Sequence, residues 1–533
     1  MAETRYIFVT GGVASSLGKG IISSSIGKLL QSRGYKVTIQ KFDPYINIDP
    51  GTLNPYEHGE CYVTVDGHEA DLDLGHYERF LGIQTTKANN ITTGRIYNNV
   101  IKKERKGDYL GKTIQVIPHI TDEIIRNIQL LGNKYKFDFV ITEIGGTVGD
   151  IESLPYLESI RQMKRRLGKN AISVHLTYVP FLAAAKELKT KPTQHSVKEL
   201  QSFGVQPDIL VLRSEHKLND TLKKKVALFC NVSDSAVIES VDMPTIYEVP
   251  IRMQEQGLDE TILKMVGLPI GKRPEMKEWR EFLARRDAAK STVNIALVGK
   301  YVQLQDAYKS ILESLSHAAT HNDRKLEVTY LNSEQLTDEN ISEKLEGIDG
   351  VVICPGFGQR GITGKYVAAK YTRMHNLPTF GICLGMQCMA IEFARNVLGY
   401  ADANSTEMDD QTAHNVIDIM EEQKSITNMG GTMRLGAYEC TVDTNSKTFE
   451  AYQTTSIQER HRHRYEFNNK YRERFEKKGM RCVGVNPDSD LVEIIEISDL
   501  KFYIGTQFHP EYSSTVLKPH PLFLSFIKAA INK

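Results

Sequence analysis

The chain has 533 residues, with 66 Lys and Arg against 66 Asp and Glu, so its formal net charge is zero. This balance argues against a general nucleic-acid or membrane-surface binder, because both need a basic excess. Seven sparse cysteines without a CxxC pair fit a reducing compartment and disfavour a disulfide framework. With no signal-peptide layout and no apolar run near the ~20 residues of a membrane span, we expect a cytoplasmic protein of two to four domains.

Short apolar strands alternate with helical segments from the N-terminus onward. The first run, 6–10, is continuously apolar, as in a buried parallel strand, and a helix is predicted over 21–32. Strands separated by helices are typical of βαβ units, so the sequence predicts an α/β fold with mostly parallel sheets. Further strands are predicted at 36–40, 137–142, 172–178 and 208–212.

The pattern changes between 269 and 291, where charged residues surround the single Trp279. We interpret 271–291 as a polar linker. Beyond it, strands are predicted at 293–298, 326–331, 350–354, 378–382, 491–497 and 502–507, with helices near 307–320 and 385–396. The sequence therefore predicts two doubly wound α/β domains, 1–270 and 292–533.

The first candidate site is the Gly-rich loop 11–20, between the first strand and the first helix. Phosphate binding needs converging backbone N–H groups, a helix N-terminus and a lysine, here Lys19. The loop is a variant of G-x-x-x-x-G-K-[ST], because Val13 replaces the first Gly and Gly20 replaces the Ser or Thr. The loop is therefore predicted to be P-loop-like.

With no hydroxyl at position 20, a bound Mg²⁺ needs other oxygen ligands, usually one or two carboxylates plus substrate phosphates. Asp71, Asp73 and Glu143 are the acidic candidates, and Glu143 ends a predicted strand, where ligands of α/β sheets gather. Lys41 ends the second predicted strand and would point into the same crevice. A lysine-rich loop at 186–191 is either a solvated charge run or a polyphosphate-binding loop.

The second candidate site is the G-x-C-x-G turn at 381–385, which precedes a predicted helix. Its glycines permit a strained strand-to-helix turn that exposes Cys383, and the helix N-terminus favours the thiolate. A thiol nucleophile needs a base and a group that orients the base. His509 and Glu511 follow the last predicted strand and fit these roles, so the sequence predicts acyl-transfer chemistry.

Other features accompany this thiol. Gly356 and Gly358 are candidate backbone N–H donors for an oxyanion. The basic run 460–464 is either a nucleic-acid patch or a clamp for a small carboxylate. The remaining cysteines are interpreted as buried and inert: Cys61, Cys230, Cys354, Cys388, Cys440 and Cys482.

Taken together, these segments resemble the CTP synthase family over nearly all of the chain. The segments specific to that family are 11–20, 41–47, 71–80, 143–152 and 189–194, whereas the Cys383 turn and 509–511 are shared with class I glutamine amidotransferases. The resemblance implies the reaction UTP + ATP + glutamine → CTP + ADP + phosphate + glutamate, the last step of de novo pyrimidine nucleotide synthesis. ATP would phosphorylate the uracil 4-oxygen, and ammonia freed at Cys383 would displace that phosphate. GTP activation, CTP feedback inhibition and a homotetramer are also implied.

The resemblance assigns roles position by position. Cys383, His509 and Glu511 would be catalytic, and Asp73 and Glu143 would hold Mg²⁺. ATP would contact Ser16, Leu17, Gly18, Lys19, Gly20, Ile21, Lys41 and Asp73. UTP, or CTP as the inhibitor, would contact Ser15, Asp150, Ile151, Glu152, Lys189, Thr190, Lys191, Pro192, Thr193, Gln194 and Lys225. Glutamine would contact Gly356, Leu384, Gly385, Met386, Gln387, Glu407 and Arg464.

The chain departs from the family at the oxyanion strand, which usually reads Pro-Gly-Gly-Phe-Gly but here reads Cys-Pro-Gly-Phe-Gly over 354–358. Pro355 has no N–H and a fixed φ, so an altered oxyanion site is expected. Two alternatives are a cobyrinate-type glutamine-dependent amidase and a filament-forming structural protein. The segments 41–47, 71–80 and 189–194 argue against the first. The joint presence of Lys19, Asp73, Glu143, Cys383, His509 and Glu511 argues against an inactive scaffold.

Overall fold

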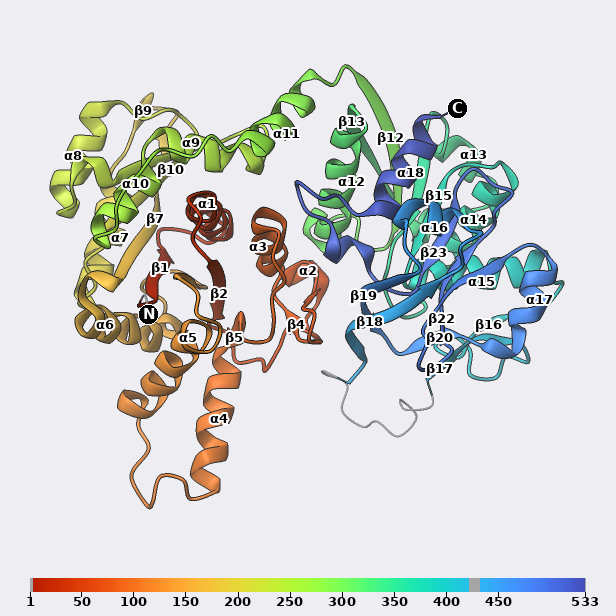
Figure 1. Cartoon of the computed structure of the whole chain (residues 1–533), viewed down its shortest axis with the longest axis horizontal. Helices are drawn as coiled ribbons and strands as arrows, with labels where there is room; N and C mark the ends of the chain where they lie inside the picture. The colour runs from red at the N-terminus through yellow and green to blue at the C-terminus, as the bar shows by residue number, and fades with distance from the viewer. Residues whose placement is uncertain (1–2, 421–431, 533) are drawn as a thin grey trace. The chain divides into compact units, whose positions relative to one another are not determined.

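The structure is a computed structural model that describes residues 3–420 and 432–532. Its contacts divide the chain into two compact units (Figure 1). Unit 1 comprises residues 1–49 and 76–277, and unit 2 comprises residues 50–75 and 278–533. Each unit contains a sheet with parallel strands, so the predicted α/β class is confirmed. Nothing in the local sequence predicted that 50–75 would fold with unit 2.

Unit 1 is built on a parallel sheet with the strand order β11-β10-β7-β1-β6-β2-β5. Every residue of β2 and of β6 is buried, because helices cover both faces of the sheet. Parallel pairing brings the carboxyl ends of β1, β2 and β6 to one edge, where the loops after them begin. The strands are β1 Arg5–Gly11, β2 Val37–Asp43, β5 Asn90–Thr92, β6 Phe139–Ile144, β7 Ala171–Tyr178, β10 Ile209–Ser214 and β11 Val237–Val241.

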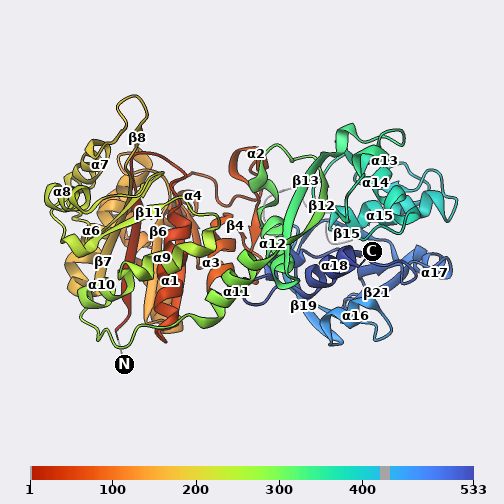
Figure 2. The same ribbon diagram turned by 90° about the horizontal axis from the view of Figure 1, so that it is seen from above.

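The helices of unit 1 lie on both faces of this sheet. Figure 1 shows α1 and α9 on one side of the strands and α5 and α6 on the other, and Figure 2 shows α9 and α1 over the strands. The helices are α1 Lys19–Ser32, α4 Thr93–Arg105, α5 Thr121–Tyr135, α6 Leu154–Leu167, α7 Lys191–Ser202, α8 Asp220–Cys230, α9 Val249–Glu255 and α10 Leu258–Met265. A further helix, α3 Asp73–Leu81, begins in unit 2 and ends in unit 1.

Unit 2 contains a mixed sheet with the order β13-β12-β14-β15-β23-β22-β21-β18-β19. Pairing is parallel from β13 to β23 and antiparallel from β23 to β19. A small sheet joins β16 Asn404–Ser405, β17 Asn415–Ile419 and β20 Tyr465–Phe467. The strands of the large sheet are β12 Ser291–Gly299, β13 Arg324–Asn332, β14 Gly350–Ile353, β15 Thr379–Ile382, β18 Arg434–Val442, β19 Ser456–His463, β21 Arg481–Val485, β22 Val492–Glu496 and β23 Tyr503–Thr506.

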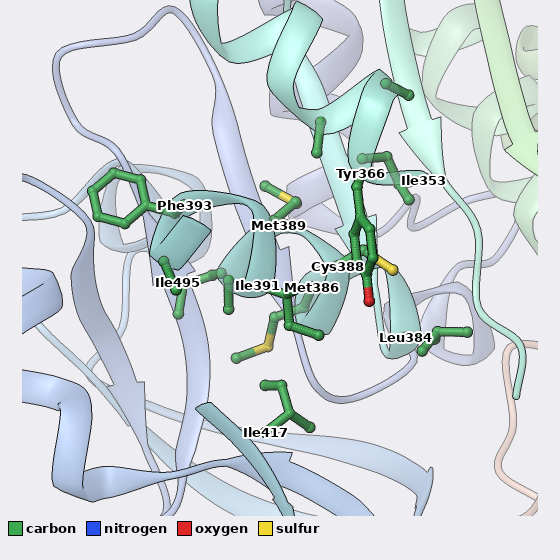
Figure 3. Packing of buried hydrophobic residues seen from close by; sticks show 14 of the residues in the cluster. Ile353, Tyr366, Leu384, Met386, Cys388, Met389, Ile391, Phe393, Ile417 and Ile495 are labelled. Carbon is green, nitrogen blue, oxygen red and sulfur yellow. The ribbon is translucent and has the colours of Figure 1, made fainter. Parts of the chain in front are cut away.

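Alternation along β12 separates two cores in unit 2. Ile295 and Leu297 pack toward α12 (Lys309–His321) and α18 (Pro521–Ile531), whereas Ala296 and Val298 pack toward α14 (Ile362–Met374) and α15 (Leu384–Asn396). Figure 3 shows Met386, Cys388, Met389 and Ile391 of α15 within the second core. The helix that follows the Cys383 turn is therefore embedded in the unit rather than lying on its surface.

Two expectations from the sequence are wrong. The segment read as a linker contains α11 (Lys277–Ala288), in which Trp279, Phe282 and Leu283 are buried. Its apolar residues recur at helical spacing, and the surrounding charges hid that pattern. Cys61 is only partly buried, whereas the other six cysteines are buried. Within residues 3–420 and 432–532, no helix has both the length and the apolar content needed to cross a bilayer.

The residues 50–75 form a compact insertion of unit 2 with a short helix, α2 (Pro55–His58), and a hairpin of β3 (Tyr62–Val63) and β4 (Glu69–Ala70). Arg460 holds this hairpin, because its guanidinium donates to the hydroxyl of Tyr62 at 3.0 Å and to the carbonyl of Val63 at 2.9 Å. The hairpin is thus tied to β19 by buried hydrogen bonds.

Candidate functional site

Cys383 occupies a sharp turn between β15 and α15. Its φ of 52° and ψ of −107° are unusual for a residue with a side chain, and its N–H donates to the carbonyl of Thr506 at 2.7 Å. A Cβ on Gly381 would lie 2.2 Å from Sδ of Met389, and one on Gly385 would lie 2.0 Å from the carbonyl oxygen of Ile353. Both glycines are therefore required by close packing, and the predicted nucleophile turn is present.

His509 and Glu511 follow β23, which pairs in parallel with β15, so they leave the sheet at the same end as this turn. Nδ1 of His509 and Oε1 of Glu511 form a hydrogen bond of 2.7 Å. Burial by itself lowers the pKa of His509, but the charges of Glu511 and Cys383 and the hydrogen bond with Glu511 raise it to about 10. The ring also stacks on Tyr512. The three residues thus have the connectivity of a nucleophile, a base and an orienting acid.

The neighbouring cysteines differ from Cys383. Burial raises the pKa of Cys354 and of Cys388 to about 12, so both remain thiols at neutral pH. This agrees with the inert role expected for them. Lys365 lies between these groups, fully buried, and its ammonium donates to the carbonyl of Cys354 at 2.6 Å.

Cys383 opens onto a cavity of about 440 Å³ in unit 2. Gly385 and Met386 are not among the lining residues, and Met386 is fully buried in the core, so these two residues would offer a ligand backbone atoms only. The other residues predicted to hold glutamine line the cavity: Gly356, Leu384, Gln387, Glu407 and Arg464.

The cavity wall carries both acidic and basic side chains, among them Glu407 and Arg464. Glu407 accepts a hydrogen bond of 2.7 Å from the N–H of Gly358, and burial raises the pKa of its carboxyl. Arg464 donates to the hydroxyl of Thr432 at 2.8 Å. A carboxylate and a guanidinium in one small cavity complement the ammonium and carboxylate of a free amino acid.

The expectation that Gly358 supplies an oxyanion donor is wrong in this structure, because its N–H is engaged by Glu407. Gly356 lines the cavity, and Leu384 is the first residue of α15, where backbone N–H groups have no acceptor within the helix. These two residues are the remaining candidates for oxyanion donors. Pro355 precedes Gly356 and contributes no N–H.

The inserted segment 50–75 supplies much of the cavity wall, which sequence reasoning missed entirely. Residues 50–53, Pro55 and 58–61 line the cavity beside Cys383. Arg462 connects this segment to β19, because its Nε donates to Glu69 at 2.9 Å and its Nη2 to the carbonyl of Gly51 at 3.0 Å. No local pattern signals such a long-range placement.

The basic run 460–464 is not a surface patch. Arg460, His461 and His463 on β19 are buried, and Arg462 pairs with Glu69. Successive side chains of β19 point to opposite faces of the sheet, so this run does not form one continuous basic surface. The nucleic-acid interpretation of this run is therefore wrong.

In unit 1, the loop 11–20 joins β1 to α1 as predicted. Lys19 is the first residue of α1, and its Nζ donates to the carbonyl of Gly146. Gly18 before it has a φ of 93°, which glycine adopts without strain. Ser15 and Ser16 are exposed in the loop. The backbone thus forms an open turn at a helix N-terminus.

Lys41 and Glu143 face each other across adjacent strands, since they are register partners in β2 and β6. The ammonium of Lys41 lies 3.6 Å from Oδ1 of Asp43, and Glu143 accepts from the hydroxyl of Tyr77 at 2.6 Å. A buried carboxylate at a strand end offers the oxygen ligands that Mg²⁺ prefers. Asp73 belongs to unit 2, so its pairing with Glu143 stays a prediction.

The residues predicted to bind the pyrimidine nucleotide lie at two places in unit 1. Asp150 accepts from the N–H of Thr147 at 3.1 Å, and Ile151 beside it is 78% exposed. The segment 189–194 runs into α7, which begins at Lys191, and Nζ of Lys191 lies 5.9 Å from the ring centroid of Phe229. Within that segment, Thr190, Thr193 and Gln194 are buried. Lys225, which lies on α8, is exposed.

Comparison with known proteins agrees with this arrangement. Residues 5–268 match the family described as CTP synthase N-terminus, and residues 303–529 match the family described as glutamine amidotransferase class-I. The chain is 80% identical to a CTP synthase of Bacteroides fragilis, with 100% of both chains covered. It is 66% identical to a CTP synthase of Porphyromonas gingivalis, covering 100% of this chain and 99% of that one.

Among solved structures, the glutaminase domain of Trypanosoma brucei CTPS with bound acivicin is 40% identical, covering 45% of this chain and 95% of that domain, with a TM-score of 0.43. The two family matches define a synthetase domain followed by a class I glutamine amidotransferase domain. With whole-length relatives at 66% and 80% identity, the chain belongs to the CTP synthase family.

Proposed function

We propose that the chain carries out the reaction of its family, the amination of UTP to CTP with ATP and with nitrogen from glutamine. The whole-length identity of 80% to a CTP synthase carries this proposal. Cys383 and the hydrogen-bonded pair of His509 and Glu511, beside a cavity whose wall includes Glu407 and Arg464, support the glutaminase half. The loop of Lys19 and the strand-end pair of Lys41 and Glu143 support the synthetase half.

In the glutaminase, the sulfur of Cys383 attacks the side-chain carbonyl carbon of glutamine. Because the pKa of His509 is raised to about 10, its imidazole holds a proton at neutral pH and can give it to the departing ammonia. Glu511 keeps the ring oriented. The oxyanion that forms on the substrate faces the N–H groups of Gly356 and Leu384.

Glutamine itself is held by Glu407 and Arg464, which pair with its α-ammonium and α-carboxylate. Gln387 and the backbone of 384–386 complete the contacts. The substrate therefore enters with its amide end toward Cys383.

In the synthetase, Lys19 and the loop residues 16–21 bind the ATP phosphates, and Lys41 stabilises the phosphoryl group in transfer. Glu143 and Asp73 would hold Mg²⁺, which supplies positive charge to the phosphate oxygens. UTP contacts Ser15, 189–194 and Lys225. CTP, as the feedback inhibitor, contacts 150–152.

The family resemblance also implies a homotetramer, activation by GTP and a cytoplasmic location, and we include these in the proposal. Subunit contacts would complete the UTP site. These features are tested by mass measurement in solution with and without nucleotide, and by glutamine hydrolysis with and without GTP.

Two variants test the division of labour. Cys383→Ala should abolish CTP formation from glutamine but retain it from added ammonia. Lys19→Ala should abolish CTP formation from either nitrogen source and leave glutamine hydrolysis intact. The assay follows CTP and glutamate separately in mixtures of UTP, ATP, Mg²⁺ and nitrogen source. Loss of ammonia-dependent synthesis in Cys383→Ala, or intact CTP formation in Lys19→Ala, would contradict the proposal.

A further inference from the structure

Gln507 contacts Cys383, and the family resemblance assigns it no role in the reaction. It follows the last residue of β23, and its side chain is fully buried. Its backbone N–H donates to the carbonyl of Glu493 at 2.8 Å, which fixes its position in the sheet. Its side-chain amide lies between Gln387 and the sulfur of Cys383.

One backbone carbonyl sets the direction of every hydrogen bond in this cluster. The carbonyl of Tyr465 can only accept, so the group of Gln387 that lies 2.8 Å from it is the donor, Nε2. The same Nε2 lies 3.1 Å from Gln507, which must therefore present its acceptor, Oε1. The remaining amide group of Gln507, Nε2 with its hydrogens, faces the sulfur of Cys383 at 3.6 Å.

The sulfur has few groups that can stabilise negative charge. Among residues 3–420 and 432–532, the other hydrogen-bond contact of the sulfur is with the carbonyl of Arg462 at 3.8 Å, and a carbonyl cannot donate to a thiolate. The titratable groups that act on Cys383 are His509, Lys365 on α14 and Cys388 on α15. His509 must also transfer protons during the reaction, so it is not a constant donor. An amide N–H does not titrate and remains a donor throughout.

We propose that Gln507 is a catalytic residue of the glutaminase, whose amide donates a hydrogen bond to the thiolate of Cys383. The sulfur is anionic twice in an acyl-transfer cycle. It attacks as a thiolate to form the C–S bond while the C–N bond breaks and ammonia leaves with a proton from His509. Water then attacks the acyl carbon to form a C–O bond and gives a proton to His509, while the C–S bond breaks and its electron pair returns to sulfur, again facing Gln507.

The same amide determines how Gln387 meets the substrate. Both hydrogens of the Gln387 amide are used, one by Tyr465 and one by Gln507. Its Oε1 has no hydrogen-bond partner among the described residues, and Gln387 lines the cavity. Gln387 is therefore presented to glutamine as an acceptor. Gln507 thus connects the nucleophile to the substrate clamp.

Two variants separate thiolate stabilisation from packing. Gln507→Met keeps the length of the side chain but removes the donor. Gln507→Glu keeps the shape and an acceptor for Gln387 but places an anionic oxygen toward the sulfur. We expect alkylation of Cys383 by iodoacetamide at pH 7 to slow about tenfold in Gln507→Met and more in Gln507→Glu, because a hydrogen bond to a charged group is lost. The acid limb of kcat/KM for glutamine hydrolysis should move to higher pH in the same order.

Ammonia-dependent CTP formation serves as the control and should change less than twofold in both variants. An alkylation profile against pH that superimposes on that of the parent in either folded variant would overturn the proposal. Failure of both variants to fold would overturn it as well, since Gln507 would then be a packing residue. The inference rests on the proposed glutaminase, which fails separately if Cys383→Ala still hydrolyses glutamine.

Discussion

Burial alone lowers the pKa of a histidine, and His175 on β7 follows this rule. Burial and then the charge of Lys19 lower its pKa to about 3. It lies between two hydroxyls, with Nδ1 at 2.9 Å from Thr10 and Nε2 at 2.8 Å from Ser196. His509 is equally buried, yet its pKa is raised to about 10 because Glu511 and Cys383 face it. The difference in pKa between His509 and His175 is therefore caused by neighbouring charge rather than by burial. His509 is protonated at neutral pH, whereas His175 is neutral.

We predict that His175 makes unit 1 less stable in acid. Its folded pKa is depressed below the ordinary value near 6.5, so between about pH 6.5 and 3 the unfolded chain binds one more proton than the folded chain. The free energy of unfolding then falls by about 1.4 kcal/mol for each pH unit that is lowered. Thermal unfolding midpoints of parent and His175→Gln should differ more at pH 7.5 than at pH 5.

The matched control is His195→Gln, because His195 is exposed on α7. Its midpoint should follow that of the parent at both pH values. A difference between parent and His175→Gln that stays constant with pH would contradict the prediction.

At the scale of elements, close packing around the turn between β15 and α15 holds Cys383 in place. The turn places Cys383 at a positive φ while Gly381 and Gly385 let the helix approach the strands. The apolar residues of α15 pack in the core shown in Figure 3. A shift of this helix would therefore move the sulfur away from His509.

We predict that Gly385→Ala destabilises unit 2 by about 1–3 kcal/mol, because its new methyl group would lie 2.0 Å from the backbone oxygen of Ile353. Glutamine hydrolysis should fall at least tenfold, while ammonia-dependent synthesis in unit 1 persists. Thermal unfolding and the two activity assays check this result.

Gly399→Ala separates crowding from backbone strain. Gly399 has a φ of 80° and nothing within 4 Å of an added Cβ, so the cost of about 1–2 kcal/mol is conformational. Gly399 does not line the cavity beside Cys383. Glutamine hydrolysis should survive in this variant. Equal loss of hydrolysis in both variants would show that the crowding at Gly385 does not position Cys383.

At the scale of the whole molecule, the chain leaves unit 1 after residue 49, folds into unit 2, and returns within α3. The segment 50–75 lines the cavity beside Cys383 and is held by Arg460 and Arg462. This early segment of the chain therefore belongs to the unit that carries Cys383. The chain therefore passes between the two units before and after 50–75 and again at the start of α11.

We predict that Glu69→Gln lowers kcat/KM for glutamine hydrolysis by about tenfold. The change removes the charge that faces Arg462, whose carbonyl lies 3.8 Å from the sulfur of Cys383. Loss of one partner from a buried ion pair leaves the other charge uncompensated. Kinetics with glutamine and with ammonia should show the loss in the first alone.

Asp66→Asn provides the control in the same hairpin. Asp66 is exposed and accepts a hydrogen bond of 2.6 Å from Thr64, and asparagine can still accept it. Its glutamine kinetics should match those of the parent. Equal loss in both variants would mean that the hairpin as a whole, rather than the Glu69–Arg462 pair, supports the site.

Prediction from sequence succeeded where the signal was local. Continuous apolar runs such as β1 and β6 identified buried parallel strands, because both faces of these strands are covered. The Gly-x-Cys-x-Gly turn and the strand before His509 were visible for the same reason, since spacing along the chain fixes their geometry. The helix α11 was missed because its charged face outnumbers its three buried apolar residues.

The sequence by itself determined the α/β class, the Gly-rich loop of Lys19, the thiol turn of Cys383, and the family to which the chain belongs. Only the tertiary structure decided that 50–75 lines the cavity beside Cys383, that Gly358 is engaged by Glu407, and that Gln507 faces the sulfur. The physical reason is distance along the chain. Periodicity and turn chemistry report on neighbours a few residues apart. These contacts join residues that are separated by 49 or more positions in the sequence, up to 393 for Arg462 and Glu69, and only packing brings them together.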